Sequence, residues 1–141
     1  MARIKLQLPE TFAFQTQIPI RIGDINYGGH MGHDAALPIM QEARVQFLQS
    51  LGYVSELDIE GRALIVTDAV IIYRSEGFYG DILKVEIAVA DLQSVGCDLL
   101  YRLSNVSSGK EVIRAKTGIA FVDAAARRIA AIPDSFRARF G

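Results

Sequence analysis

The sequence predicts an α+β fold in which an antiparallel sheet wraps one long helix. Three observations lead to this class: a single strand near the start, a strongly apolar helical stretch after it, and β patterns that dominate from residue 62 onward. Nothing except those later strands can cover so apolar a helix, so the sheet must fold around it. We expect residues 1–141 to form a single domain.

Residues 12–22 are predicted to form the first strand, because Phe12, Phe14 and Thr16 alternate with other residues and would share one face. Pro19 cannot donate to a sheet ladder, which predicts an edge position or a bulge there. A polar turn with four glycines follows, and glycine lets the backbone come close to a ligand.

Residues 35–51 have apolar side chains at close to helical spacing: Ala36, Met40, Ala43, Phe47 and Leu51. Asp34 is expected to cap the start of this helix, and Gly52 to end it. Pro38 falls in the first turn, where it removes few hydrogen bonds. Further apolar residues on other faces predict a helix that is buried around most of its circumference.

The second half of the chain predicts consecutive antiparallel strands separated by turns, at residues 63–74, 82–92, 96–106 and 111–122. A short extended run is expected at residues 129–132. Pro133 and Asp134 then open a last helical turn that contains Phe136 and Phe140.

The charge balance, the apolar runs and the single cysteine limit the functional classes to which the protein could belong. The chain has 15 basic and 16 acidic residues, and a net charge of −1 argues against nucleic acid or an anionic membrane as the main partner. No apolar run reaches the ~18 residues of a membrane helix, and the first residues do not resemble a signal peptide, so a cytoplasmic protein is expected. The single cysteine, Cys97, lies in a strand pattern and is expected to be a packed side chain.

The polar turn after the first strand holds most of the chemically versatile side chains. Asp24, Asn26 and His30 occur within it, and His33 and Asp34 follow at once. Buried cores rarely collect such residues, so the turn is the predicted functional site. The two histidines lack a third ligand placed by the sequence, and no metal site is predicted.

The start of the helix is expected to present backbone N–H groups that could bind a ligand. The first N–H groups of a helix have no partner inside it, and the helix dipole favours negative charge at that end. The backbone amides of His33 and Asp34 are therefore candidates to polarise a carbonyl and to stabilise an oxyanion.

The turn and helix together resemble a known family. Gly23, Asp24, an apolar residue, Asn26, Gly29 and His30, followed by a helix with Glu42, Ala43, Arg44 and Phe47, resemble the acyl-CoA thioesterases of the 4-hydroxybenzoyl-CoA thioesterase family, which have the hotdog fold. The resemblance continues through Tyr73, Arg74, Gly80 and Asp81 to Ile132 and Pro133.

The resemblance implies hydrolysis of an acyl-CoA to the free acid and CoA, with no separate cofactor because CoA is part of the substrate. It implies a substrate-binding surface that includes Tyr27, Gly29 and Arg74. It also implies a homodimer or a dimer of dimers, with the apolar strand at residues 63–74 pairing with its twin. The basic residues that could meet the CoA phosphates are not distinguished by the sequence: Arg74, Lys84, Arg102, Arg114, Lys116, Arg127 and Arg128.

One position departs from the family pattern. Members usually have a second aspartate two residues after the first, as base or nucleophile, and Asn26 stands there in this chain. A carboxamide cannot take the proton, although it can orient a water molecule, so the base must be Asp24, His30 or Glu42. We expect Asp24, in a solvated turn, to be the base. Its alternative role is to tie down the loop, and Glu42 on the buried helix is expected to pair with Arg44 or a strand residue, or to act as a base with raised pKa.

Two other functions fit the same residues. The order of Asp24, Asn26 and His30 also resembles the Gly-Asp-x-Asn-Pro…His signature of hotdog (R)-specific enoyl-CoA hydratases. Tyr27 stands where that signature has proline, and the histidine lies one residue further on. A non-catalytic acyl-CoA binder is the remaining alternative, with Asn26 marking the loss of hydrolysis.

Overall fold

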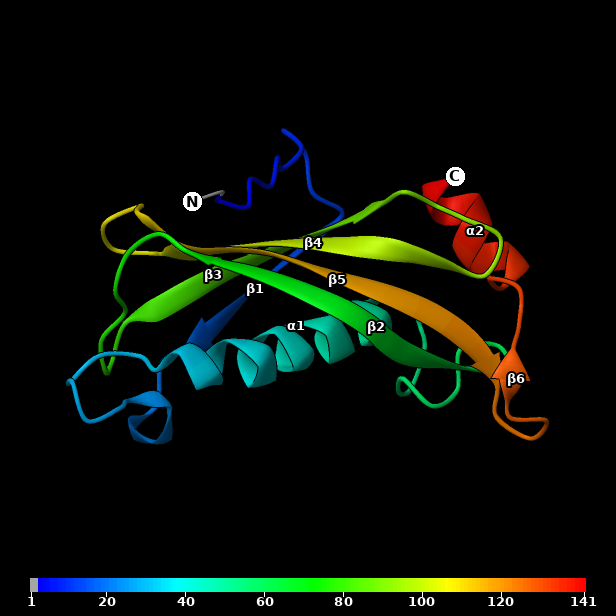
Figure 1. Ribbon diagram of the computed structural model, residues 1–141, viewed down its shortest axis with the longest axis horizontal. Coiled ribbons are helices and arrows are strands. Elements are labelled where there is room, and N and C mark those ends of the chain that lie inside the picture. Colours follow the sequence, from blue (N-terminus) through cyan, green and yellow to red (C-terminus); the bar gives the residue numbers. More distant parts are fainter. Residues whose placement is uncertain (1–2) are drawn as a thin grey trace.

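The computed structural model describes residues 3–141, in which a curved antiparallel sheet lies over one long helix (Figure 1). The elements in chain order are β1 (Phe14–Pro19), a 3₁₀ turn (Ile22–Asp24), a second 3₁₀ turn (His33–Ala35), α1 (Ala36–Ser50), β2 (Arg62–Tyr73), β3 (Ile82–Ala90), β4 (Gly96–Asn105), β5 (Glu111–Asp123), β6 (Arg128–Ile129) and α2 (Asp134–Phe140). The predicted fold class is confirmed.

The strands of the sheet follow the order β1-β3-β4-β5-β2, and β6 adds a short pair to β5. All neighbours are antiparallel. Pro19 ends β1, which is an edge strand as predicted. The strand is shorter than the expected residues 12–22, because Phe12 leaves the sheet and packs its ring 4.8 Å from the Arg102 guanidinium. The extended run expected at residues 129–132 pairs only at Arg128–Ile129.

Helix α1 packs one face against the inner face of the sheet. Its buried apolar residues are Ala36, Ile39, Met40, Ala43, Phe47 and Leu48. They meet buried side chains from alternate positions of the strands, among them Leu83, Val85, Ile87, Leu99, Leu103, Ile113 and Phe121. Each large side chain buried in this layer stabilises the fold by about 1.5–3 kcal/mol. Figure 1 shows α1 lying beneath the sheet.

The prediction that α1 is buried around most of its circumference is wrong. Leu37, Gln41, Glu42 and Gln49 are exposed, because the sheet covers only one side of the helix in a single chain. Half of the Leu37 side chain remains in contact with solvent. An exposed apolar residue on this side of the helix is available for contact with another surface.

The two ends of α1 differ in how well they were predicted. Asp34 does not cap the helix: it lies in the preceding 3₁₀ turn, and Ala35 occupies the N-cap position without a side-chain hydrogen bond. The 3₁₀ turn starts the helical path early, which removes the need for a polar cap. At the other end, Gly52 has φ +96° and its N–H donates to the Gln49 carbonyl at 3.0 Å, confirming the predicted stop.

Helix α2 closes the far end of the core with aromatic side chains. The Phe136 ring centroid lies 5.5 Å from that of Phe121 on β5. The Phe140 ring lies 5.8 Å from Phe47 on α1, which in turn lies 5.6 Å from Phe14 on β1. These separations are typical of favourable aromatic pairs, so the predicted last helical turn is part of the core.

One ion pair lies inside the protein. The guanidinium of Arg44 on α1 donates to the carboxylate of Glu56 in the loop that follows the helix, and their side chains are only 8% and 15% exposed. Arg44 also lies 3.4 Å from the Tyr101 hydroxyl, which is 2.7 Å from the Thr117 hydroxyl. This chain of polar groups ties α1 to the centre of the sheet.

The prediction that Glu42 pairs with Arg44 or with a strand residue is wrong. Glu42 accepts a hydrogen bond from the Gln46 amide at 2.8 Å, on the solvent side of the helix. Residues four apart face each other on a helix, whereas residues two apart such as Glu42 and Arg44 do not. The inward-facing Arg44 finds its acid in the loop instead.

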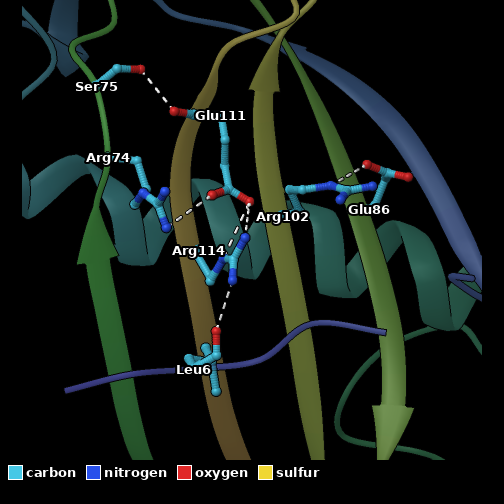
Figure 2. Close-up of polar contacts among 7 residues, drawn as sticks. All are labelled: Leu6, Arg74, Ser75, Glu86, Arg102, Glu111 and Arg114. Carbon is cyan, nitrogen blue, oxygen red and sulfur yellow. Dashed lines mark hydrogen bonds and ion pairs between the residues drawn. The ribbon is translucent and has the colours of Figure 1, made fainter. Parts of the chain in front are cut away.

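The outer face of the sheet carries alternating charges, as Figure 2 shows. Arg102 and Arg114 stand directly opposite each other on β4 and β5, and Glu86 and Glu111 lie 3.0 Å and 3.2 Å from them. Arg114 also donates to the Leu6 carbonyl at 2.9 Å, so the N-terminal segment crosses this face. The acids offset the repulsion between the arginines.

Glu56→Gln should destabilise the fold by about 3–5 kcal/mol, because it leaves the buried Arg44 guanidinium without a counter-charge. The measurement is the urea midpoint of unfolding at unchanged m-value. Glu42→Gln is the matched control, since Glu42 is exposed, and its effect should stay within about 0.5 kcal/mol. A Glu56→Gln midpoint equal to that of wild type would contradict the importance of this pair.

Candidate active site

Two loops meet beside the start of α1, at residues 20–33 and 74–81. The Met31 N–H donates to the Gly77 carbonyl at 2.7 Å, and the Gly80 N–H donates to the Ile20 carbonyl at 3.2 Å. A Cβ added at Gly77 would stand 2.6 Å from the terminal methyl of Ile20, so any larger residue here requires that side chain to move. The backbone contacts fix the polar turn against the sheet.

Asn26 organises the polar turn. Its N–H donates to the His30 carbonyl at 2.9 Å, and its side-chain oxygen accepts the Gly28 N–H, also at 2.9 Å. Gly29, with φ +84°, donates its N–H to the Asn26 carbonyl at 3.0 Å. Across residues 3–141, the Asn26 side-chain NH₂ has no hydrogen-bond acceptor. It is available to a ligand.

His30 stands beside Asn26. A Cβ added at Gly28 would be 3.2 Å from both the Asn26 Oδ1 and the His30 Nε2 atoms, so both side chains border the same small space. The His30 Nδ1 atom lies 3.2 Å from the Met31 carbonyl, and Nε2 lies 3.9 Å from the Glu76 carboxylate. An N–H at Nδ1 would bond that carbonyl and leave Nε2 as an acceptor.

Asp24 is buried, in contrast to the solvated position that the sequence led us to expect. The side chain is 8% exposed, and its carboxylate accepts the Arg21 N–H at 2.8 Å with the Arg21 Nε atom at 3.6 Å. The residue thus ties down the loop, which is the alternative role considered for it. Within the described part of the chain, no hydrogen bond or ion pair joins Asp24 to His30.

The start of the helix presents free amides. The N–H groups of His33 and Asp34 have no acceptor among residues 3–141, whereas the Ala35 N–H donates to the Gly32 carbonyl at 3.1 Å. The carbonyl of His33 accepts the Tyr73 hydroxyl from β2 at 2.9 Å. Partial burial and the nearby Asp34 carboxylate raise the pKa of Tyr73, so this hydroxyl keeps its proton at neutral pH.

The side chains of Asp34 and Asn26 both border Gly32. A Cβ added at Gly32 would stand 2.4 Å from the Asp34 Oδ1 atom and 3.4 Å from the Asn26 Cβ atom. Sequence reasoning considered only the backbone amide of Asp34. The carboxylate was missed because its proximity to Asn26 depends on the path of the loop, for which the sequence carries no signal.

The remaining predicted residues lie apart from this cluster. Glu42 lines a groove of about 410 Å³ between α1 and β1, together with Arg21 and Gln46. Arg74 lies 3.7 Å from Glu111 on the outer face of the sheet (Figure 2). Tyr27 is fully exposed in the polar turn. No group of three His, Cys, Asp or Glu side chains within residues 3–141 is arranged to hold a metal ion.

The family is decided by comparison with known sequences. Residues 20–140 match the model of the thioesterase-like superfamily. The chain belongs to this superfamily. The match confirms the predicted enzyme class, a thioester hydrolase, and no curated protein sequence matches the chain.

Several solved structures share the fold. A putative thioesterase from Pseudomonas aeruginosa has a TM-score of 0.84 at 23% identity, covering 93% of this chain and all of the other. A 1,4-dihydroxy-2-naphthoyl-CoA thioesterase from Synechocystis has a TM-score of 0.80 at 21% identity, over 90% and 94%. A Staphylococcus aureus protein determined in complex with CoA has a TM-score of 0.81 at 18% identity, over 96% and 85%.

These likenesses confirm the hotdog fold of this thioesterase-like chain. The observed element order, with one helix under a curled antiparallel sheet, is the arrangement the three structures share over most of their length. No helix between residues 3 and 141 is long and apolar enough to cross a membrane.

Proposed function

We propose that this chain hydrolyses acyl-CoA thioesters to the free acid and CoA. The observation that carries the proposal is the pair of free N–H groups of His33 and Asp34, which open the helical path beside Asn26 and His30. Such amides stabilise the negative charge that develops on a thioester oxygen when water attacks. The Staphylococcus aureus neighbour determined with CoA supports a ligand of this type.

The side chains of the turn supply the rest of the reaction. The free NH₂ of Asn26 and the ring of His30 orient the thioester and the attacking water. We propose Asp34 as the base, because its carboxylate borders Gly32 on the same turn as Asn26, whereas Asp24 is tied to Arg21 and Glu42 lies in a separate groove. Asp34 takes a proton from water as the C–O bond forms. The C–S bond then breaks, and the proton passes to the leaving CoA sulfur.

A dimer would complete the substrate site. Strand β2 pairs on one side only, with β5, and its exposed middle includes Ile65 and Val66. An unpaired apolar edge is a template for a second copy, and two-fold pairing of β2 with its twin would extend one sheet through both chains. The β2 end with Tyr73 contacts His33, so such a dimer would bring the partner close to the free amides.

The CoA phosphates have no assigned cation. Arg74, Lys84, Arg102 and Arg114 each lie within 4 Å of an acid on the outer face of the sheet. The four cations share only two acids, Glu86 and Glu111, so these contacts do not single out one of them as the phosphate ligand. We retain Tyr27 and Gly29 as the proposed substrate contacts, since both lie in the exposed part of the turn.

The function is tested by incubating the pure protein with a panel of acyl-CoAs of different chain length, including benzoyl-CoA and crotonyl-CoA. Release of free CoA thiol is expected with at least one saturated acyl-CoA. Loss of enoyl absorbance without thiol release would instead identify a hydratase. Tight binding with neither change would identify a non-catalytic binder.

Asn26→Ala should lower turnover about tenfold or more, the size of losing one positioned hydrogen bond in the transition state. Asn26→Asp should keep or raise turnover, because a carboxylate restores the arrangement usual in the resembling family. The matched control is Asn105→Ala, since Asn105 also accepts the N–H two residues on, at 2.9 Å, but in the β4–β5 hairpin and not in the polar turn. Equal rates for Asn26→Ala and wild type would show that this side chain takes no part in the chemistry.

Three carboxylate variants identify the base. Asp34→Asn should reduce turnover about a hundredfold or more, the usual scale for loss of a general base, with the fold unchanged. Asp24→Asn should mainly destabilise the loop, and Glu42→Gln should leave turnover within about threefold of wild type. If Asp24→Asn or Glu42→Gln abolished turnover in a folded protein while Asp34→Asn did not, the base would be reassigned to that residue.

Light scattering at micromolar concentration should give two or four times the 15.5 kDa mass of one chain, because pairing of β2 edges covers apolar surface. Replacing Val66 by lysine should shift the mass toward one chain. A wild-type protein with the mass of one chain would contradict both the dimer and the shared site.

A further inference from the structure

Tyr73 makes a contact that the hydrolysis proposed above has not used. It is the last residue of the edge strand β2, and its hydroxyl donates to the His33 carbonyl at 2.9 Å, across 40 positions of sequence. The side chain is about half exposed, so it is not needed to fill the core. The hydroxyl reaches a single backbone atom at the start of the helical path.

That atom belongs to the same peptide group as a proposed oxyanion donor. The His33 carbonyl and the Asp34 N–H are two ends of one planar amide, and the Asp34 N–H has no acceptor in the described chain. A donor on the oxygen polarises the amide and strengthens its N–H as a donor, by roughly 10–30% per bond in a hydrogen-bonded chain. The bond also fixes the plane of the amide.

The local geometry gives this amide no side-chain cap from its own turn. The 3₁₀ turn has no side-chain cap, since Gly32 precedes it and Asp34 makes no capping bond. The turn is three residues long, and its Ala35 N–H is held by the Gly32 carbonyl. The Tyr73 hydroxyl is the side-chain donor that reaches the peptide between His33 and Asp34.

We propose that Tyr73 is a positioning residue for thioester hydrolysis: its hydroxyl orients and polarises the His33–Asp34 peptide, whose N–H receives the developing negative charge on the thioester oxygen. This inference rests on the proposed function. Tyr73 would thereby connect strand β2 to the reacting atoms. In the single chain, β2 pairs with β5 on one side and has no partner on the other.

The test compares Tyr73→Phe with Tyr79→Phe. Tyr79 is an exposed tyrosine with no hydrogen bond among residues 3–141, so it controls for loss of a phenol near the same loops. With the best acyl-CoA of the panel, kcat of Tyr73→Phe should fall about five- to tenfold. That is less than the 10²–10³-fold effect of removing an oxyanion donor itself, because the amide remains. KM should change less than twofold, and Tyr79→Phe should match wild type.

A second measurement needs no turnover. In a ¹⁵N-resolved NMR spectrum, the Asp34 amide nitrogen should move upfield in Tyr73→Phe, because its peptide oxygen loses a donor, and should stay in place in Tyr79→Phe. An unmoved Asp34 signal would overturn the inference by showing that the contact does not act on that amide.

The two measurements separate the possible failures. A shifted Asp34 signal with wild-type kcat in Tyr73→Phe would reject the positioning role and leave the proposed thioesterase intact. A wild-type protein that releases no thiol from any acyl-CoA would reject the proposed function and the positioning role with it. A shifted signal together with the selective loss in kcat would support both.

Discussion

The burial of α1 against the inner face of the sheet is the constraint on which the rest of this molecule depends. One face of the helix is apolar, and the strands β3, β4 and β5 supply the matching surface. The sheet covers one side only, which leaves Glu42 and Leu37 in solvent. The same packing fixes the helix start at the end of the sheet, where the two loops meet. A free N–H group is chemically useful only when its position is held this firmly.

Most of the polar groups in the turn are committed to the fold. The Asp24 carboxylate accepts the Arg21 N–H, and the Asn26 side-chain oxygen accepts the Gly28 N–H. The Gly77 carbonyl accepts the Met31 N–H. In the described chain, the groups left for a ligand include the N–H groups of His33 and Asp34, the Asn26 carboxamide NH₂, a ring nitrogen of His30 and the Asp34 carboxylate. A site made this way depends more on the path of the backbone than on the identity of any single side chain.

The fold was largely predictable, because alternation and helical spacing are local properties that survive in the structure, as α1 and the four long strands show. The contacts that define the site are not local. Glu56 reaches Arg44 from an irregular loop, and Tyr73 reaches His33 across 40 residues, so no spacing rule could have found either. Asp24 was expected in solvent because its neighbours are glycines, yet the path of the turn buries its side chain to 8% exposure. The family resemblance supplied the enzyme class, which physical patterning alone could not.

The order of the elements along the chain has a consequence for synthesis. Helix α1 is complete at Ser50, but β5, which helps to cover it, ends at Asp123, and the aromatic residues of α2 come later still. At about 5–20 residues per second, the apolar face of the helix waits roughly 4 to 15 seconds on the ribosome before its cover exists. Among residues 3–141, β1 precedes α1, and the strands β3, β4 and β5 that cover the apolar face all follow it. Chaperones that bind apolar helices would find their substrate in this interval, and folding is completed only after β5 and α2 emerge.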